Sequence, residues 1–505
     1  MKNILQFLEK TAERFPDKIA YADVDRSVTF AQFVKECKSV ASKILQKDIR
    51  NKAIAVYDNR DVNTLVGMFG TMYSGNHYVV IDSHSPADRI QKIYDVAQPV
   101  FALIEAQNAE LANQIKSDCV NLDITQELSN KIDDKKLSRA REKSISTDLA
   151  YILFTSGSTG APKGTAVSHL SVITYMEWYI SALGVSEKTT FGSQTSFYFS
   201  ASVSDTYSVV FCGATLHIIP RSYFAFPIKL VEFLNERKVN MLYWVPSALC
   251  IVANTKLFDY AKLEYIEKVV FIGEVMPNKQ LNYWRRNLPN VMYANLFGPT
   301  ETVDICTYYI IDRPFRDDEA LPIGKPCDNV DAFIVDENDK LVTEVGKVGE
   351  LIIRSPFVAY GYFRNKEKTD AAFVQNPLHN DYPETVYRTG DLVKLNTYGE
   401  FDYCGRKDFQ IKHMGYRIEL GEIETNASAI ENVNIVVCLY DKDEDKIVMI
   451  YQGRAKEDFV MSEIRKKVPA YMEPNVLIKV SQMPFNQNGK IDRAYLNKNY
   501  KEYLK

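Results

Sequence analysis

The sequence predicts an α/β protein with a large N-terminal domain of βαβ subdomains, a small β-barrel subdomain and a small α+β C-terminal domain. Three observations support this prediction. Short apolar runs alternate with helical patterns up to about Pro314, which is typical of parallel sheets. Between about 330 and 405 the pattern changes to short strands and turns. After Gly405, a charged junction that contains glycine leads into a compact mixture of helices and strands.

The elements follow in order along the chain. In the first 150 residues helical patterns separate short apolar runs, and 128–147 is expected to form an exposed connector because it is rich in Lys, Arg, Asp and Ser. A buried strand is expected at 151–154, and Gly349–Arg354 is typical of the strands in the β-rich part. Further buried strands are expected at 54–57, 78–81, 100–104, 269–272 and 291–294.

Length, charge and cysteine content limit the class of protein. The 505 residues exceed what one hydrophobic core supports, so roughly two to four domains or subdomains are expected. The formal net charge of −4 indicates neither a nucleic-acid nor a membrane partner. Neither a transmembrane run nor a signal peptide is recognised, so a cytoplasmic location is expected. The eight cysteines form no CxxC pair and are expected to be buried thiols, and the six histidines lack ligand spacing.

A loop rich in glycine and hydroxyl residues follows the strand expected at 151–154. Thr155–Gly164 contains three glycines, four hydroxyl residues and one lysine. Glycines let a backbone approach a bulky anion, and N–H groups, hydroxyls and an ammonium can bind phosphate oxygens. Because Pro162 precedes the lysine, this is not a Walker A loop. The loop therefore predicts a polyphosphate site, and a surface turn is the alternative.

Two carboxylates follow tight turns further along the chain. The Gly-Pro pair within Asn295–Glu301 enforces a turn and presents Thr300 and Glu301 at its exit. A carboxylate beside phosphates needs a bridging cation, so Glu301 predicts Mg²⁺. Asp391 ends the segment 387–391 and can accept hydrogen bonds from both ribose hydroxyls. The alternatives are a helix-start carboxylate for Glu301 and a turn former for Asp391.

Three further segments complete the pattern: Gly405–Asp408, Gly415–Glu424 and Asn488–Arg493. In this order, the six segments resemble those of the adenylate-forming superfamily. The resemblance is strongest to the amino-acid-type adenylation enzymes of nonribosomal peptide synthesis and to D-alanine–carrier protein ligases. It covers nearly the whole chain, from Ala12–Asp17 to Lys490.

The resemblance implies an ATP-dependent, AMP-forming ligase with ATP and Mg²⁺ as cofactors. A carboxylate attacks the α-phosphorus of ATP to give acyl-AMP and pyrophosphate, and a phosphopantetheine thiol then takes the acyl group. Lys490 would bridge the carboxylate and the ATP oxygens, Thr300 would contact the α-phosphate and Glu301 would hold Mg²⁺. A lysine suits the first role because its ammonium is a compact charge on a flexible stem.

The resemblance also assigns the nucleotide-binding residues. The phosphates would be held by Thr155, Ser156, Gly157, Ser158, Thr159, Gly160 and Lys163, the adenine by Gly273, Glu274, Asn295 and Phe297, and the ribose by Asp391 and Arg406. Phe297 stands where the family often has tyrosine, so the aromatic face is kept and the hydroxyl is lost.

The expected domains are an adenylation core at 1–405, with its β-rich subdomain at about 330–405, and a mobile lid domain at 406–505. Members of the superfamily rotate the lid between the two half-reactions. Asp408 matches the hinge position. After rotation, the loop around Gly415 would replace Lys490 at the active site.

The substrate pocket departs from the family pattern at Ser200. Enzymes for α-amino acids carry aspartate there, and burying an ammonium without a counter-charge is costly, so a standard α-amino acid is not expected. Asp304 could instead meet the amine of a β- or ω-amino acid, or accept a hydrogen bond from a hydroxyl or phenol. Its alternative role is a helix-start residue facing solvent, and Asp205 is interpreted as structural. The expected pocket residues are Ser200, Ala201, Ser204, Tyr243, Val270, Ile272, Leu296, Asp304 and Ile305.

Several functions remain open. An aryl, hydroxy or β/ω-amino acid is the favoured substrate. The alternatives are an acyl-CoA ligase, a ligase joining D-alanine or another amino acid to a carrier protein, and a non-catalytic nucleotide-binding protein. The form of Arg417–Glu424 favours a carrier protein, and the presence of both Lys490 and Glu301 argues against loss of catalysis. Because the sequence ends soon after Lys490, the carrier is expected to act in trans. The resemblance to stand-alone members of the family implies a monomeric enzyme.

Overall fold

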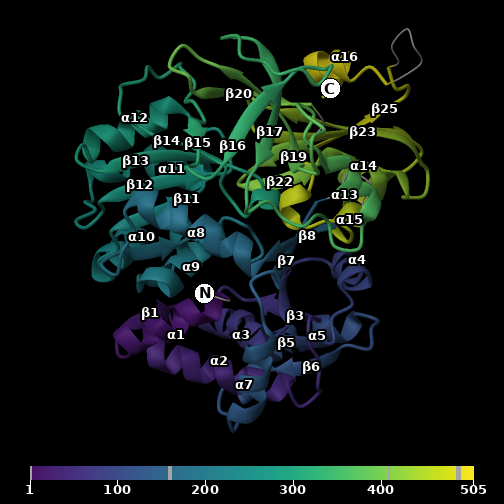
Figure 1. The fold of residues 1–505 in the computed structure, drawn as a ribbon. Coiled ribbons are helices and arrows are strands. Elements are labelled where there is room, and N and C mark those ends of the chain that lie inside the picture. The colour runs from purple at the N-terminus through teal and green to yellow at the C-terminus, as the bar shows by residue number, and fades with distance from the viewer. Residues whose placement is uncertain (1–2, 157–161, 408–409, 485–490, 505) are drawn as a thin grey trace.

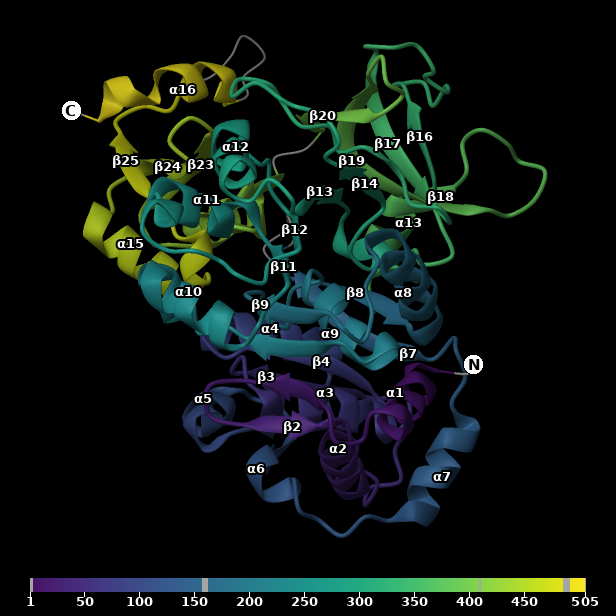
Figure 2. The ribbon, with the colours of Figure 1, turned by 90° about the vertical axis from the view of Figure 1, so that its left-hand side faces the viewer.

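The structure, a computed structural model, describes residues 3–156, 162–407, 410–484 and 491–504. It contains two large sheets with helices on their faces, an antiparallel β-rich part, and a C-terminal unit that packs against the rest of the molecule (Figure 1). A second view shows the N-terminal helices and strands at one end of the molecule and the C-terminal unit towards the other (Figure 2). The α/β fold class predicted from the sequence is confirmed.

The first sheet has six strands in the order β6-β5-β3-β4-β7-β8. Their bounds are β3 Ala53–Asp58, β4 His77–Asp82, β5 Phe101–Ile104, β6 Val120–Asp123, β7 Leu149–Thr155 and β8 Lys163–Ser168. The strands from β6 to β7 are parallel, whereas β8 returns antiparallel to β7. Thr155 and Lys163 are register partners, so the two ends of the predicted phosphate loop lie side by side.

The second sheet has nine strands in the order β15-β14-β13-β12-β11-β9-β10-β1-β2. Their bounds are β1 Ile19–Ala22, β2 Ser27–Thr29, β9 Thr190–Ser193, β10 Thr215–Ile218, β11 Met241–Trp244, β12 Lys268–Ile272, β13 Met292–Phe297, β14 Thr307–Ile310 and β15 Lys325–Pro326. The five pairings from β1 to β13 are parallel. Gly273 and Gly298 therefore leave β12 and β13 at the same edge, where parallel sheets commonly bind ligands.

Helices fill the space between the sheets and cover their outer faces. Ile54 and Val56 of β3 share a core with helices α1, α2, α3, α8 and α9 and with strands of the second sheet. Ala55, on the opposite face, packs with α4 and α5, while α10, α11 and α12 share a separate core with the second sheet. The helix bounds are α1 Ile4–Arg14, α2 Phe30–Ile44, α3 Val62–Tyr73, α4 Ala87–Ala97, α5 Ala109–Gln114, α6 Ile124–Glu127, α7 Asp134–Lys143, α8 His169–Leu183, α9 Ser202–Cys212, α10 Pro227–Glu236, α11 Pro246–Asn254, α12 Asn278–Asn287 and α13 Lys366–Ala372.

The β-rich part predicted at about 330–405 forms a five-stranded antiparallel sheet. Its strands are β16 Asp331–Val335, β17 Val348–Arg354, β18 Phe373–Gln375, β19 Thr385–Leu395 and β20 Phe401–Arg406. Asp391 of β19 and Arg406 of β20 are register partners. The sheet therefore brings together the two residues expected to bind the ribose.

The C-terminal unit has hydrophobic cores of its own. It begins with the hairpin β21–β22, and a three-stranded sheet β23-β24-β25 follows. The bounds are β21 Gln410–His413, β22 Tyr416–Glu419, α14 Leu420–Ser428, β23 Val433–Asp441, β24 Lys446–Gly453, α15 Glu457–Arg465, β25 Val476–Val480 and α16 Arg493–Asn499. Separate cores allow this unit to move as one body.

The connector expected at 128–147 is largely exposed, with Leu137 and Ser144 as its buried residues. It contains helix α7, which was not predicted and which begins where the Asp133 side chain accepts a hydrogen bond from the Lys136 N–H. The expectation of uniformly buried cysteines was wrong at Cys404, which is exposed, although all eight cysteines are free.

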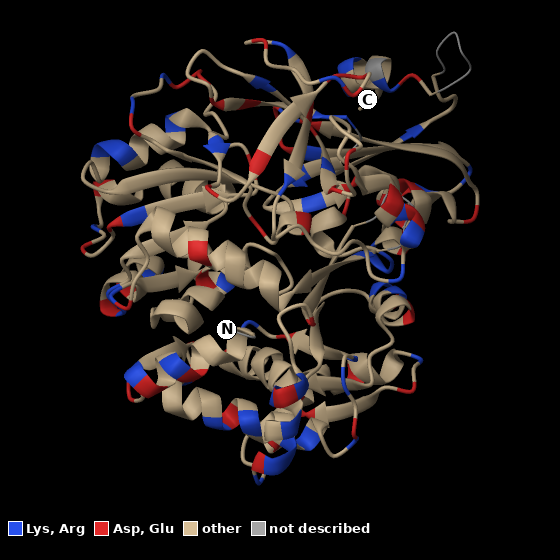
Figure 3. Ribbon diagram, in the orientation of Figure 1, with Lys and Arg blue, Asp and Glu red and all other residues tan. Residues whose placement is uncertain are grey.

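Three further properties concern surface charge, membrane-spanning helices and metal-binding groups. Basic and acidic side chains are interspersed over the molecule (Figure 3). Throughout the described ranges, every helix is too short or too polar to cross a bilayer. The same ranges hold no group of three histidine, cysteine or acidic side chains placed to bind a metal ion.

Candidate active site

A pocket opens beside the ends of β12 and β13, between the first sheet, the β-rich part and the hairpin β21–β22. Ten of the residues predicted from the sequence line it: Thr155, Ser156, Ser200, Ala201, Ile272, Gly273, Thr300, Asp304, Asp391 and Arg406. They come from both large sheets, the β-rich part and the turn before α9. The pocket therefore joins the predicted nucleotide site to the predicted acid site.

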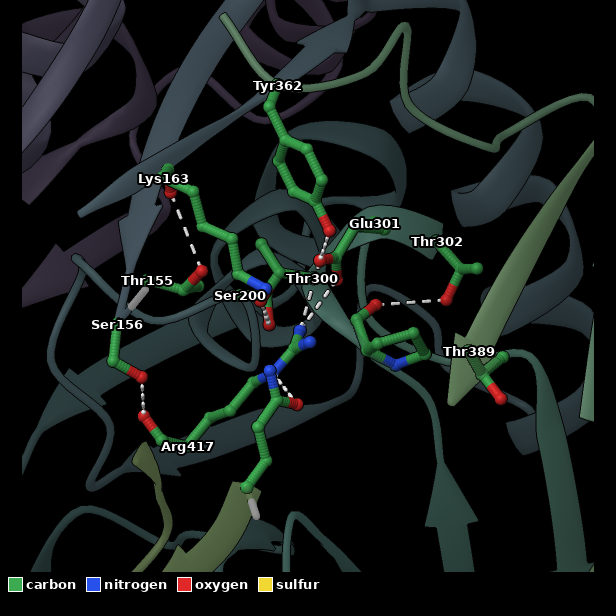
Figure 4. Close-up of polar contacts among 12 residues, drawn as sticks. Thr155, Ser156, Lys163, Ser200, Thr300, Glu301, Thr302, Tyr362, Thr389 and Arg417 are labelled. Carbon is green, nitrogen blue, oxygen red and sulfur yellow. Dashed lines mark hydrogen bonds and ion pairs between the residues drawn. The ribbon is translucent and has the colours of Figure 1, made fainter. Parts of the chain in front are cut away.

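Glu301 lies in the short helix η4 (Thr300–Thr302) and is fully buried. Tyr362 donates a hydrogen bond of 2.6 Å to Oε1, and the Arg417 Nη1 lies 3.1 Å from Oε1 and 2.8 Å from Oε2 (Figure 4). Burial would raise the pKa of Glu301, but Arg417 and Lys163 outweigh it and hold the pKa at about 2. The carboxylate is therefore ionised, and its counter-ion is a side chain of the C-terminal unit.

Glu301 also fits the role of Mg²⁺ ligand. Magnesium in phosphate-transfer sites is commonly held by one or two carboxylates, with substrate phosphates and water completing the shell. A buried, ionised carboxylate beside the phosphate loop meets this description. In the described arrangement the carboxylate is paired with Arg417.

The edges of the phosphate loop contact the C-terminal unit. Ser156 donates a hydrogen bond of 2.7 Å from Oγ to the Arg417 carbonyl and accepts one of 3.1 Å from the Glu419 N–H. Lys163 Nζ lies 3.5 Å from Glu419 Oε1 and 5.2 Å from the centroid of the Tyr362 ring. Burial, assisted by Arg417, lowers the pKa of Lys163 to about 8. The predicted loop residues Gly157, Ser158, Thr159 and Gly160 lie outside the described residues.

At the predicted ribose site, Arg406 forms an ion pair with Asp391. Arg406 Nη1 lies 2.9 Å from Asp391 Oδ1 and also donates to the Thr389 carbonyl at 2.9 Å. Asp391 is buried, and Arg406 supplies the counter-charge beside it.

The predicted adenine side contacts the C-terminal unit as well. Lys412 Nζ lies 4.6 Å from the centroid of the Phe297 ring. Glu274 Oε1 accepts a 2.6 Å hydrogen bond from the Gly415 N–H, and Oε2 accepts one of 2.8 Å from Ser247. Asn295 points elsewhere, since its Nδ2 donates to the Pro322 carbonyl at 2.9 Å. Residues 412–415 thus cover the place expected for adenine.

The predicted acid site has a neutral rim and an acidic floor. At the rim, Thr300 Oγ1 donates to Ser200 Oγ at 3.2 Å. Deeper, Asp304 Oδ2 accepts hydrogen bonds from Tyr243 (2.5 Å), Ser204 (2.7 Å) and Tyr175 (3.4 Å). Asp304 is buried, so the alternative of a solvent-facing helix start was wrong. Burial raises its pKa to about 6. The remaining expected pocket residues Val270, Leu296 and Ile305 are buried in the main core.

Contacts on both sides of the pocket hold the C-terminal unit in place. Arg89 of α4 forms a buried ion pair with Glu422 of α14, and Lys92 donates to Asn426 at 3.3 Å. Tyr416 stacks on Tyr471 with ring centroids 3.8 Å apart and meets the edge of Phe199 at 4.7 Å. The loop around Gly415 is thus at the pocket. Lys490 and the expected hinge residue Asp408 lie outside the described residues.

Sequence reasoning missed several residues of the site. The role of Arg417 as counter-ion of Glu301 and the position of Lys412 could have been sought, since both basic residues fall in or beside a recognised segment. Tyr362 and Tyr175 gave no signal, because single tyrosines in a strand-rich region or on an apolar helix are typical of core positions.

This combination of two large sheets, a separate C-terminal unit and a composite pocket is that of the adenylate-forming ligases, which use ATP to activate carboxylic acids and release AMP. A family model described as AMP-binding enzyme matches residues 8–363, and the chain belongs to this family. The resemblance predicted from the sequence is confirmed at this level.

Relatives and solved structures extend the comparison. Tyrocidine synthase 1 of Brevibacillus parabrevis is 30% identical over 503 residues, which are 98% of this chain and 45% of that protein. The chain thus spans less than half of this relative. An artificially fused adenylation–PCP di-domain, NpsA-ThdA from Klebsiella oxytoca, has a TM-score of 0.80 at 21% identity, with 94% of this chain and 93% of that chain covered. A double mutant of o-succinylbenzoate CoA synthetase from Bacillus subtilis, bound to a product analogue, has a TM-score of 0.84 at 18% identity, with 99% and 98% covered.

Proposed function

We propose that this protein adenylates a small carboxylic acid and transfers the acyl group to the phosphopantetheine thiol of a separate carrier protein. The observation that carries the proposal is the composite pocket, which Thr300, Asp391 and Arg406 line on the nucleotide side and Ser200 and Asp304 on the acid side. Both reactants of an adenylation would meet there.

The first step is an in-line displacement at the α-phosphorus. A carboxylate oxygen of the acid forms a bond to phosphorus, the bond to the β-phosphate oxygen breaks, and pyrophosphate leaves. Because both reactants are anions, the site must neutralise charge as the transition state forms. Thr300 would donate to the α-phosphate, Lys163 would contact the leaving phosphates, and Lys490 would approach the reacting oxygens. Mg²⁺ on Glu301 would supply further charge neutralisation when bound.

The described arrangement suits the second step better than the first. Arg417 occupies the cation position on Glu301, and Lys412 covers the face of Phe297. The proposed domains are 1–405 and 406–505, with rotation at Asp408 bringing Lys490 in for adenylation and the Gly415 loop in for transfer. Such exchange is a common use of hinge motion. The separate cores of the C-terminal unit support this proposal.

The second step needs a thiol that accepts the acyl group, and we propose that this thiol belongs to a carrier protein. The likeness to an adenylation–PCP di-domain supports a carrier protein as acceptor. We propose that this carrier acts in trans on a monomeric enzyme. The likeness to a CoA synthetase supports the alternative, an acyl-CoA ligase. A cytoplasmic location belongs to the same proposal, since ATP is consumed and all eight cysteines are free.

The acid is proposed to lack an α-ammonium. Ser200 gives the rim of the pocket no negative charge, and an unpaired ammonium is costly to bury. An aryl, hydroxy or β/ω-amino acid fits this rim, whereas D-alanine or another α-amino acid would need a counter-charge elsewhere.

ATP–pyrophosphate exchange with a panel of acids tests the proposal. Exchange that depends on one class of acid and that Lys490→Ala lowers at least about hundredfold is expected. Thioester formation is then compared between CoA and a phosphopantetheinylated carrier protein. Faster reaction with CoA would favour the alternative ligase, and exchange with no acid would favour a non-catalytic nucleotide-binding protein.

A further inference from the structure

Two buried carboxylates lie in and near the acid site. Asp304 lines the pocket, and Asp205, in the first turn of α9, is fully buried and close enough for the charge of Asp304 to act on it. Burial raises the pKa of Asp205 to about 7, and the nearby charge of Asp304 contributes to this increase. The two acids thus form one negatively charged region.

The hydrogen bonds around these acids are incomplete. All three hydrogen bonds described above for Asp304 fall on Oδ2. Asp205 Oδ2 and the hydroxyls of Tyr179 and Tyr151 are buried without a hydrogen-bond partner in the part of the chain that the structure describes. An unpaired buried carboxylate oxygen is costly. This region therefore favours a ligand that brings positive charge and hydrogen-bond donors.

The surrounding protein supplies little positive charge. The side chains that face Asp304 are the hydroxyls of Tyr175 on α8, Ser204 on α9 and Tyr243 on β11. Lys412 of β21 is the cation that acts on Asp304 in the described residues. Asp391 attracts Lys412 more strongly, and the Lys412 ammonium lies over Phe297, where adenine is expected. Nucleotide binding would therefore move Lys412 away and leave Asp304 without a protein cation.

We infer that Asp304 is the specificity-determining counter-ion for the terminal ammonium of an ω-amino acid. This inference rests on the proposed adenylation function and narrows its substrate to one class. A primary ammonium carries three donors and one positive charge, which match an acidic floor lined by hydroxyls. A hydroxy or aryl acid would add hydrogen bonds or apolar contact but would leave the two buried carboxylates without a cation.

The depth of Asp304 selects ω- over α-amino acids. Ser200, which would meet an α-ammonium, contacts Thr300 at the rim, whereas Ser204, four residues later, contacts Asp304. Ser200 lies in the turn before α9, whereas Ser204 lies in the first turn of that helix. The ammonium therefore lies deeper in the pocket than an α-ammonium would, with methylene groups between it and the reacting carboxylate.

Pyrophosphate exchange with matched pairs of acids tests the inference. Each ω-amino acid from 3-aminopropionate to 5-aminopentanoate is compared with the hydroxy acid of the same length, and benzoate, salicylate and L-alanine are added. The best ω-amino acid is expected to exceed its hydroxy partner in kcat/KM at least about tenfold. Asp304→Asn should reverse this preference, mainly through the KM of the amino acid, whereas the exposed control Asp317→Asn should preserve it.

A second measurement keeps the test decisive if Asp304→Asn does not fold. n-Propylammonium should inhibit exchange by the wild-type enzyme in competition with the acid, and 1-propanol should not. Preference for a hydroxy or aryl acid, or equal inhibition by the two probes, would overturn the inference and leave the proposed function intact. Preference for an α-amino acid would overturn both the inference and the proposed class of acid, and would leave the adenylation reaction itself intact. Exchange with no acid at all would overturn the inference and the proposed function.

Discussion

The Arg417 Nη1 lies 2.8 Å from Oε2 of Glu301, although 116 residues separate the two in the chain. Both side chains are buried or nearly so, and Tyr362 completes the contacts of the carboxylate. The residue predicted to hold Mg²⁺ is therefore neutralised by the C-terminal unit. We expect Arg417 and Mg²⁺ to alternate on this carboxylate, so that the C-terminal unit in the described orientation would compete with the metal.

Arg417→Ala is expected to separate the two half-reactions. Removing one partner of a buried ion pair typically costs about 3–5 kcal/mol, and here the cost falls on the docked arrangement alone. Thioester formation should fall at least about tenfold, while pyrophosphate exchange should stay within about threefold of the wild type. Single-turnover kinetics measure both steps. Arg465→Ala, which removes an exposed ion pair with Glu473, is the control. Equal loss in both steps would contradict the alternation.

The ion pair between Arg89 and Glu422 is expected to support docking without touching the chemistry. Both side chains are buried, and they join α4 to α14. Arg89→Glu should therefore slow thioester formation at least about tenfold, and adding Glu422→Arg should restore part of the rate. A double-mutant cycle measures the coupling. The exposed pair Lys366–Asp370, treated in the same way, should show coupling near zero. Absence of rescue in the swapped enzyme would count against this role.

Ser200→Asp is expected to admit α-amino acids. The new carboxylate would lie at the rim beside Thr300, where an α-ammonium needs a counter-charge. The ratio of kcat/KM for glycine to that for the preferred acid should rise at least about tenfold. Ser200→Ala, which changes size but adds no charge, should leave the ratio unchanged. If both variants change the ratio alike, charge at this position does not set specificity.

The use of ω-amino acids should depend on pH through Asp304. Burial raises its pKa to about 6, so the carboxylate is ionised above pH 6 and neutral below it. Only the ionised form attracts an ammonium. The kcat/KM for the ω-amino acid, divided by that for its hydroxy partner, should therefore fall about tenfold per pH unit below pH 6 and level off above it. The ratio removes the effect of Lys163, whose pKa is about 8 and which acts on both acids alike. Protonation of Asp205, whose pKa is about 7, weakens the attraction for the ammonium in the same direction. A flat ratio from pH 5 to pH 8 would contradict the role of Asp304.

The alternating parallel sheets could be predicted because short apolar runs are a strong signal of buried strands. The strand expected at 78–81 lies within β4 (His77–Asp82), and that expected at 269–272 lies within β12 (Lys268–Ile272). Helix α7 was not predicted, since its stability depends on capping by Asp133 and on one buried leucine rather than on an apolar face.

The nucleotide side of the pocket could be predicted because its residues cluster in short segments with their own turn chemistry. Thr300 and Asp391 both lie at the pocket as expected. The partners of these residues could not be predicted. Arg417 meets Glu301, and Tyr175 meets Asp304, only after strands and helices distant in sequence pack together. Such contacts depend on tertiary packing, which the local pattern does not encode.

The most direct test of the central claim is the product analysis of a single turnover with Mg²⁺-ATP and the preferred ω-amino acid. Mass spectrometry should detect the acyl adenylate and pyrophosphate in equal amounts, with AMP appearing only after a thiol acceptor is added. Formation of ADP and phosphate, or of no nucleotide product with any acid of the panel, would contradict the account.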